Sequence, residues 1–247
     1  MISVIIPAHN EETWIANCIR SVQIAADRVK QDVEIIVSIN ACTDNTEGVA
    51  RELGAIIVEE SERCVAKVRN RGLATATGEI LVTLDADSTL SPNYLAEVER
   101  LMATGRYLAG AGLMVTDRLG LATILLGIVL VFPALMLMRF SGGMFWMSRE
   151  AYLATGGFDE QYLTGEDFHF WRALRSLARQ QHKRFGMIWR AYIRTSARKM
   201  DELGTWFMLT HPHWFYHAIK GDNRDFANRY LYQTSRSRDN KENKNNE

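Results

Sequence analysis

The chain has 247 residues, of which 47% are apolar, and this is enough to bury one substantial core. Its 29 basic and 29 acidic residues cancel, so no overall field draws it toward nucleic acid, which is not an expected partner. The three cysteines lie far apart without CxxC spacing, which argues against a disulfide framework and a zinc site. Composition therefore predicts one main domain whose charges act locally.

Strand and helix patterns alternate along the first third of the chain. The expected strands are the apolar runs Ile2–Ile6, Val33–Ile39, Ala55–Val58 and Glu79–Leu84. Helical patterns follow the first three runs, starting near Glu11, starting near Asp44, and covering Val65–Ala76. This alternation predicts an α/β fold with a mostly parallel sheet sandwiched by helices, and ligands of such sheets bind beyond the carboxyl ends of the strands.

The two ends of the chain and one central segment bear on location. The first residues run straight into a strand pattern without the features of a signal peptide, so a cytoplasmic protein is expected. The segment Leu119–Met138 is nearly all apolar, lies between two arginines and is long enough to cross a bilayer. Residues from about Gln233 to Glu247 are polar without apolar periodicity, which predicts a disordered tail.

An aspartate pair, Asp85 and Asp87, ends the apolar run that starts at Ile80. Magnesium and manganese ions prefer oxygen ligands, and an ion held by one or two carboxylates can offset the charge of a diphosphate. The alternative is that both aspartates only cap the following turn. Their position at a strand end favours the metal site.

An acidic pair, Glu166 and Asp167, starts a helical pattern, where the helix dipole favours an ionised carboxylate. Asp167 shares the face that should pack inward, and Glu166 points a little to one side. That inward face carries Trp171, Leu174 and Ala178. Asp167 is therefore the better candidate for a general base, and ordinary N-terminal capping is the alternative.

Two further residues could take part in such a site. Arg69 offers paired donors suited to diphosphate oxygens, although surface decoration of a helix fits its spacing equally well. His211 could give a neutral imidazole to a metal, although histidines in an aromatic-rich segment more often serve packing.

Five motifs in one order resemble the family 2 glycosyltransferases, with a GT-A fold and a Rossmann-like nucleotide-binding half, over roughly residues 1 to 200. Two motifs, Val4–Glu12 and Val68–Gly72, resemble the nucleotide-binding segments of the family, and Leu84–Asp87 resembles its metal motif. Gly156–Glu160 resembles the acceptor-side motif, and Gly165–Asp167 resembles the motif of the catalytic base. The resemblance implies an inverting transfer of a sugar from a nucleoside-diphosphate sugar to an acceptor hydroxyl, assisted by Mn²⁺ or Mg²⁺. The acceptor would be a carbohydrate or a lipid-linked molecule.

The resemblance also implies roles for individual residues. The donor nucleotide would lie against Pro7, Ala8, Asn10, Glu12, Asn40, Arg69, Asp85 and Arg198. Asp87 would bind the metal, with Asp85 near it or near the ribose and His211 as a further candidate ligand. Asp167 would be the base, with Glu166 beside it.

The loop after the second strand departs from the family pattern. Members usually carry an acidic residue there that recognises the nucleobase of the donor, and this chain has Asn40 instead. An asparagine carbonyl can accept from a uracil imide, so a UDP-sugar is the expected donor and a GDP-sugar stays open.

The domain expected from these signals covers residues 1–232, with 233–247 as the tail. Residues 1–105 would form the nucleotide-sugar half, 106–200 the acceptor half and 201–232 a C-terminal helical extension. A single crossing by Leu119–Met138 would put the metal and base motifs on opposite sides of a bilayer, so a buried or interfacial helix kinked at Pro133 is expected instead.

A basic block lies between Phe168 and Met200, with nine basic residues and no acidic one. Arg172, Arg175 and Arg179 recur at helical spacing and could face anionic lipid headgroups or a phosphate-bearing acceptor. Peripheral contact with the inner face of an anionic membrane is one reading of this block, and a solvated basic face is the other.

Two other functions compete with the transferase. A nucleotidyltransferase usually begins with a glycine-rich loop, and the first loop here has no glycine. A catalytically silent nucleotide-sugar sensor could keep the same pocket, although the intact Asp85, Asp87 and Asp167 speak against it.

Overall fold

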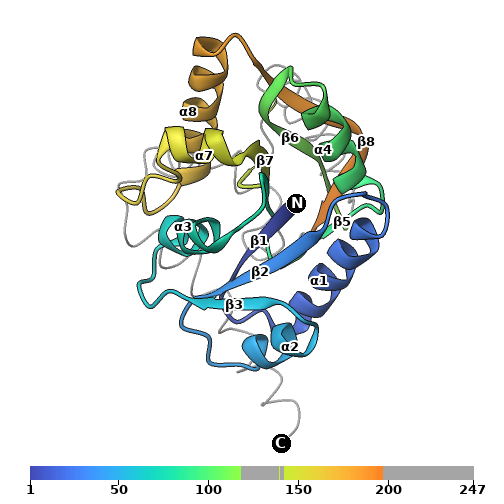
Figure 1. Cartoon of the computed structure of the whole chain (residues 1–247). Helices are drawn as coiled ribbons and strands as arrows, with labels where there is room; N and C mark the ends of the chain where they lie inside the picture. Colours follow the sequence, from blue (N-terminus) through green and yellow to red (C-terminus); the bar gives the residue numbers. More distant parts are fainter. Residues whose placement is uncertain (118–138, 140–141, 197–247) are drawn as a thin grey trace, which may run out of the picture.

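The structure is a computed structural model in which residues 1–117, 139 and 142–196 are described (Figure 1). The predictions for Leu119–Met138, Arg198, His211, the C-terminal extension and the tail therefore lie outside the described residues. Within the described ranges, no helix is long and apolar enough to cross a membrane.

The described elements alternate as the sequence predicts in the first half. The strands are β1 Ile2–Ala8, β2 Val33–Ile39, β3 Ile56–Glu59, β4 Ile80–Thr83, β5 Ser88–Leu90, β6 Tyr107–Thr116, β7 Phe145–Ser148 and β8 Arg184–Thr195. The helices are α1 Glu12–Ala26, α2 Thr46–Glu52, α3 Val65–Thr75, α4 Tyr94–Ala103, α7 Arg149–Thr155 and α8 Glu166–Gln180. The helix expected from about Asp44 starts at Thr46, because the Asp44 carboxylate accepts the Thr46 N–H at 3.1 Å in the preceding turn.

These strands form one sheet in the order β3-β2-β1-β4-β7-β6-β8-β5. The pairs β1 with β2, β1 with β4 and β2 with β3 are parallel, which confirms the parallel arrangement predicted for the first strands. The second half is mixed: β7 runs antiparallel to β4 and β6, and β5 runs antiparallel to β8, while β6 and β8 are parallel. The fold class is α/β, as predicted.

Helices cover both faces of the sheet (Figure 1). Alternate residues of β1 point to opposite sides, so Ile2, Val4 and Ile6 pack in a core with α1 and α4. Ile5 packs in the other core, with α3, α7 and α8. Buried residues on both faces explain why the first strand is a nearly continuous apolar run.

Glycines in the second half make room for one large side chain. A Cβ on Gly110 of β6 or Gly186 of β8 would overlap the ring of Trp146 in β7. The indole is buried, and its N–H donates to the Ala111 carbonyl at 3.1 Å. The small residues of β6 and β8 are therefore needed to close the sheet around Trp146.

Candidate active site

The loops after β1 and β2 lock together at the carboxyl end of the sheet. Oδ1 of Asn10 accepts the Thr43 N–H at 2.7 Å, and Asn10 has a positive φ of 52°. The Glu12 carboxylate accepts the Asn45 N–H at 3.0 Å, and the Glu12 N–H donates to Asp44 at the same distance. Pro7 is partly exposed and Ala8 is buried at the end of β1. The predicted nucleotide-binding loop is thus held in one shape by the loop after β2.

Asn40 is buried beneath the segment that follows β3, with 2% of its surface exposed. Its amide group donates to the carbonyls of Glu60 at 2.7 Å and Glu62 at 2.8 Å. Two carbonyl acceptors require the two N–H donors of an amide, so Oδ1 is the atom left over, and it has no partner among the described residues. Contact between this oxygen and a nucleobase stays a prediction, and in this conformation the oxygen is covered.

The aspartate pair, Asp85 and Asp87, directly follows β4, and both residues are partly exposed. Burial raises the pKa of the neighbouring Cys18 thiol well above its ordinary value, and the charges of Asp87 and Asp85 raise it further. The Ser196 N–H donates to the Asp87 carbonyl at 3.2 Å, so β8 ends beside this motif. Both carboxylates therefore create one region of negative potential at the edge of the sheet.

This donor set fits a divalent metal held together with substrate. Magnesium and manganese ions commonly use one or two carboxylates and take their other ligands from phosphate and water. Among the described residues, no group of three or more histidine, cysteine, aspartate and glutamate side chains could hold a metal. A metal at the aspartate pair would therefore need further ligands such as phosphate oxygens, and its binding by Asp87 and Asp85 stays a prediction.

Arg69 of α3 joins the two acidic motifs. Its guanidinium lies 2.8 Å from Asp85 Oδ1, and Nε lies 3.9 Å from Glu166 Oε1. Nη1 donates to the Gly143 carbonyl at 2.8 Å, and a Cβ at Gly143 would overlap the guanidinium. The side chain is 6% exposed, so surface decoration is the wrong interpretation of Arg69. Arg69 therefore lies between one carboxylate of the aspartate pair, Asp85, and one of the acidic pair, Glu166.

The acidic pair, Glu166 and Asp167, opens α8 after Gly165, which has a φ of 73°. Glu166 is the more buried of the two, with 8% of its surface exposed, and it faces Arg69. The expectation that Glu166 points aside is therefore wrong. Spacing on α8 cannot reveal Arg69, which reaches this helix from α3. Asp167 is partly exposed, as a group that meets an acceptor should be, and its Oδ1 accepts the Phe168 N–H at 2.7 Å.

Burial makes both carboxyls of this pair harder to ionise. Burial raises the pKa of Glu166 to about 7, and the charge of Asp167 raises it while Arg69 opposes the change. Burial also raises the pKa of Asp167, against the opposing effects of Arg69 and the Phe168 N–H. With a pKa of about 7, Glu166 holds a proton part of the time near neutral pH, which removes a negative charge from beside Asp167.

The raised pKa of Glu166 predicts a pH effect on stability. Its stabilising contribution is complete below the ordinary value of 4.5 and is lost as pH rises through about 7, because the folded carboxyl retains a proton that the unfolded one releases. Relative to wild type, Glu166→Gln should therefore gain about 1–3 kcal/mol of unfolding free energy between pH 4.5 and 7.5. Urea unfolding at both pH values measures this gain, and a difference that stays constant with pH would contradict it.

Two side chains with structural roles at the site went unnoticed in the sequence. Asn70 donates to the Phe158 carbonyl at 2.8 Å and accepts the Phe158 N–H at 2.9 Å, which clamps the acceptor-side motif onto α3. The Thr83 hydroxyl, at the end of β4, donates to the Gly143 carbonyl at 2.7 Å. A hydroxyl in an otherwise apolar buried strand was the available signal for Thr83.

Solved structures share this fold. The chain superimposes with a TM-score of 0.63 on S. aureus TarS in complex with UDP-GlcNAc, at 19% identity over 79% of this chain and 58% of that one. Mannosyltransferase PcManGT from Pyrobaculum calidifontis, in complex with GDP-Man and Mn²⁺, gives 0.62 at 23% identity over 78% and 56%. The fold is therefore the GT-A glycosyltransferase fold.

The first half of the chain is similar in sequence to known glycosyltransferases. The family model "Glycosyl transferase family 2" matches residues 3–122. Glycosyltransferase AglE of Haloferax volcanii is 30% identical over 122 residues, which are 47% of this chain and 40% of the relative. Undecaprenyl-phosphate 4-deoxy-4-formamido-L-arabinose transferase of Aeromonas hydrophila is 30% identical over 112 residues, 41% of this chain and 32% of the relative. The matched part thus spans less than half of either relative, and residues 3–122 of the chain carry the family 2 glycosyltransferase pattern.

Proposed function

We propose that the protein moves a sugar from a nucleoside-diphosphate sugar to an acceptor hydroxyl with inversion, using Asp167 as the general base. The observation that carries this proposal is the buried Arg69, which contacts Asp85 at 2.8 Å and lies 3.9 Å from Glu166. A partly exposed acid next to a partly exposed aspartate pair offers a place for a proton acceptor beside a place for a leaving diphosphate.

The reaction needs one displacement at the anomeric carbon. Asp167 takes the proton of the acceptor hydroxyl, and the acceptor oxygen forms a bond to this carbon as the bond to the diphosphate oxygen breaks. The nucleoside diphosphate leaves from the opposite face with the electron pair. A divalent metal bound by Asp87 and Asp85 supplies charge stabilisation to that leaving group.

Arg69 and Glu166 are proposed to assist this reaction through their charges. Arg69 offsets the mutual repulsion of three carboxylates, and the raised pKa of Glu166 reduces the negative charge beside Asp167 near neutral pH. Glu166 is therefore proposed as a positioning residue that tunes Asp167.

Related proteins support only the chemical class of the donor and of the acceptor. TarS and PcManGT were solved in complex with UDP-GlcNAc and GDP-Man, the second also with Mn²⁺, which supports a uridine or guanosine nucleotide and a divalent metal. The Aeromonas relative is named for transfer to undecaprenyl phosphate, which supports a lipid-linked acceptor beside a carbohydrate one. Peripheral contact with an anionic membrane belongs to the same proposal, as do nucleotide contacts by Arg198 and metal binding by His211.

Calorimetry with a panel of nucleoside diphosphates and nucleotide sugars tests the donor site. One nucleotide should bind in the presence of Mn²⁺, and Asp87→Ala should weaken this binding by about tenfold or more, because a metal ligand is lost. Asp27→Ala, which removes an exposed carboxylate at the end of α1, is the matched control. Equal affinities in the two variants would contradict the metal site, and binding of no nucleotide by wild type would overturn the transferase.

A further inference from the structure

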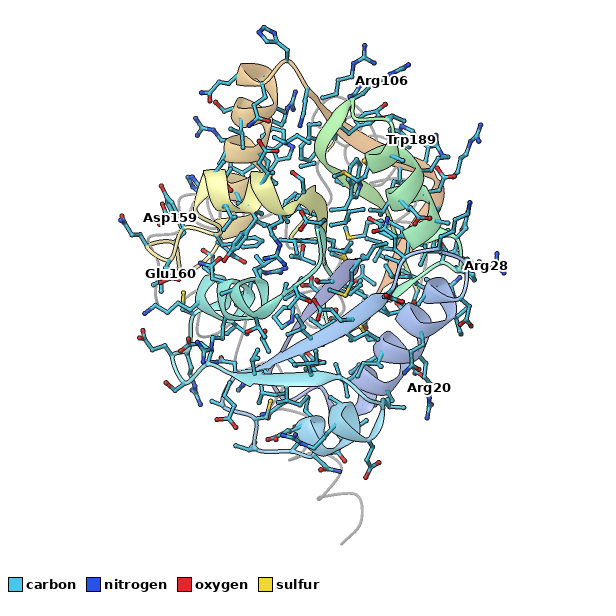
Figure 2. The ribbon with its side chains drawn as sticks, viewed as in Figure 1. Arg20, Arg28, Arg106, Asp159, Glu160 and Trp189 are labelled. Carbon is cyan, nitrogen blue, oxygen red and sulfur yellow. The ribbon has the colours of Figure 1, made fainter. Side chains whose placement is uncertain are left out.

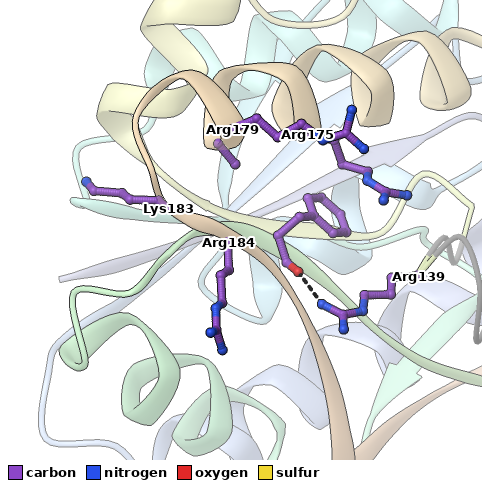
Figure 3. A pocket seen from close by; sticks show the side chains of 7 residues that line it. Arg139, Arg175, Arg179, Lys183 and Arg184 are labelled. Atoms are coloured by element: carbon purple, nitrogen blue, oxygen red, sulfur yellow. Dashed lines mark hydrogen bonds between the residues drawn. The ribbon is translucent and has the colours of Figure 1, made fainter.

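A basic pocket lies between the last turns of α8 and the start of β8 (Figure 3). Its volume is about 280 Å³, near the lower end of the roughly 300–1,000 Å³ of small-molecule sites, so it suits a compact group. Five cationic side chains line it, with the buried Ala178 and Phe185: Arg139, Arg175, Arg179, Lys183 and Arg184.

The backbone brings these cations together from three segments. Arg175 and Arg179 are one helical turn apart on α8 and so share a face. The chain then turns back at His182, which has a φ of 54°, and the Lys183 N–H donates to the Ala178 carbonyl at 2.8 Å. Arg139 comes from the other side of the pocket, and its guanidinium donates to the Phe185 carbonyl at 3.0 Å (Figure 3).

The pocket concentrates positive charge without a carboxylate in its lining. The guanidinium of Arg175 lies 4.7 Å from the Trp171 ring centroid, which holds it in place. Burial lowers the pKa of Arg175, and the charges of Arg179 and Arg139 lower it further. Glu150 of α7 accepts from the Gln181 side chain at 3.4 Å but does not line the pocket. Cations gathered this closely repel one another, and a bound anion would remove that cost.

The pocket is separate from the proposed donor site. Arg175 and Arg179 lie eight and twelve residues beyond Asp167 on α8. At 1.5 Å per residue, they are about 12 Å and 18 Å from Asp167 along the helix axis. A group bound there contacts neither the aspartate pair nor the acidic pair.

We propose that this basic pocket binds a phosphate group at a second site, remote from the reacting centre. Phosphate oxygens match the forked donors of arginine, and arginines from α8 and β8, together with Arg139, line the pocket. The phosphate comes either from a soluble phosphorylated compound or from the headgroup of an anionic lipid, because both present the same oxygens.

Sodium pyrophosphate titrated by calorimetry, in low salt with a metal chelator, tests the soluble source. Vesicles of phosphatidylcholine with and without phosphatidylglycerol, followed by co-sedimentation, test the lipid source. Wild type should bind pyrophosphate, phosphatidylglycerol vesicles or both. The double variant Arg175→Gln/Arg179→Gln should bind about tenfold more weakly or worse, because two charge-assisted contacts are lost.

Arg20→Gln/Arg28→Gln is the matched control, because these exposed arginines lie at α1 and just after it, away from α8 (Figure 2). If pyrophosphate binds at the donor site instead, its affinity should be the same in the pocket variant and in wild type. That result would contradict the proposal. A second variant, Lys183→Gln/Arg184→Gln, alters the other wall of the pocket outside α8 and should weaken binding even where the first variant unfolds. Binding of neither probe, or equal loss in the pocket and control variants, would overturn the proposal.

Discussion

Asp167→Asn is expected to lower the rate of sugar transfer by about 10²–10⁴-fold while nucleotide affinity stays within about twofold. The amide keeps the size of the carboxylate and can still accept the Phe168 N–H, which lies 2.7 Å from Oδ1 in the wild type. It cannot take a proton from the acceptor. Transfer measured with the nucleotide sugar found by calorimetry, as a single-turnover rate, separates this chemical step from product release.

Two matched variants make this result specific. Glu166→Gln removes the other carboxyl of the acidic pair, whose pKa is raised to about 7, and retains Asp167, so it should alter the pH dependence of transfer more than its maximal rate. Asp27→Asn changes an exposed carboxylate and should have no effect. A full rate in Asp167→Asn together with a lost rate in Glu166→Gln would move the base to Glu166. Nucleotide binding without any transfer by wild type would favour the silent sensor.

The first half of the fold could be predicted from short-range pattern alone. β2 begins and ends at the predicted residues, Val33 and Ile39, because a short apolar run between two helical patterns is typical of a buried strand. The later strands gave a weaker signal. β6 and β8 carry glycines at positions 110 and 186 that a large ring from β7 requires, and this requirement is visible only in three dimensions.

The site was predictable in its parts and not in its connections. The aspartate pair follows a strand, and the acidic pair opens a helix, as expected. The contact between Arg69 and Gly143 joins residues 74 positions apart, so helical spacing on α3 could not tell a buried guanidinium from a surface one. The same missing contact explains why the orientation of Glu166 was predicted wrongly.

Arg69→Met is expected to lower the unfolding free energy by about 3–5 kcal/mol at pH 7.5, the usual cost of leaving buried charge uncompensated. Arg69 is the cation that offsets Asp85, Glu166 and Asp167, and its own pKa is raised by them against the effect of burial. Without this cation the pKa values of Glu166 and Asp167 rise further, so the variant should lose less stability at pH 5, where these carboxyls take up protons.

Arg71→Met is the matched control for this loss, because Arg71 is exposed on the same helix, and its change should stay within about 0.5 kcal/mol. Arg69→Lys tests geometry apart from charge: an ammonium retains the positive charge but cannot contact Asp85 and the Gly143 carbonyl through one planar group. It should therefore recover part of the stability in urea unfolding and little of the transfer rate. Equal losses of unfolding free energy in Arg69→Met and Arg71→Met would mean that the contacts of Arg69 with the acidic motifs do not stabilise the fold. That result would contradict the proposed coupling of the metal site and the general base through Arg69.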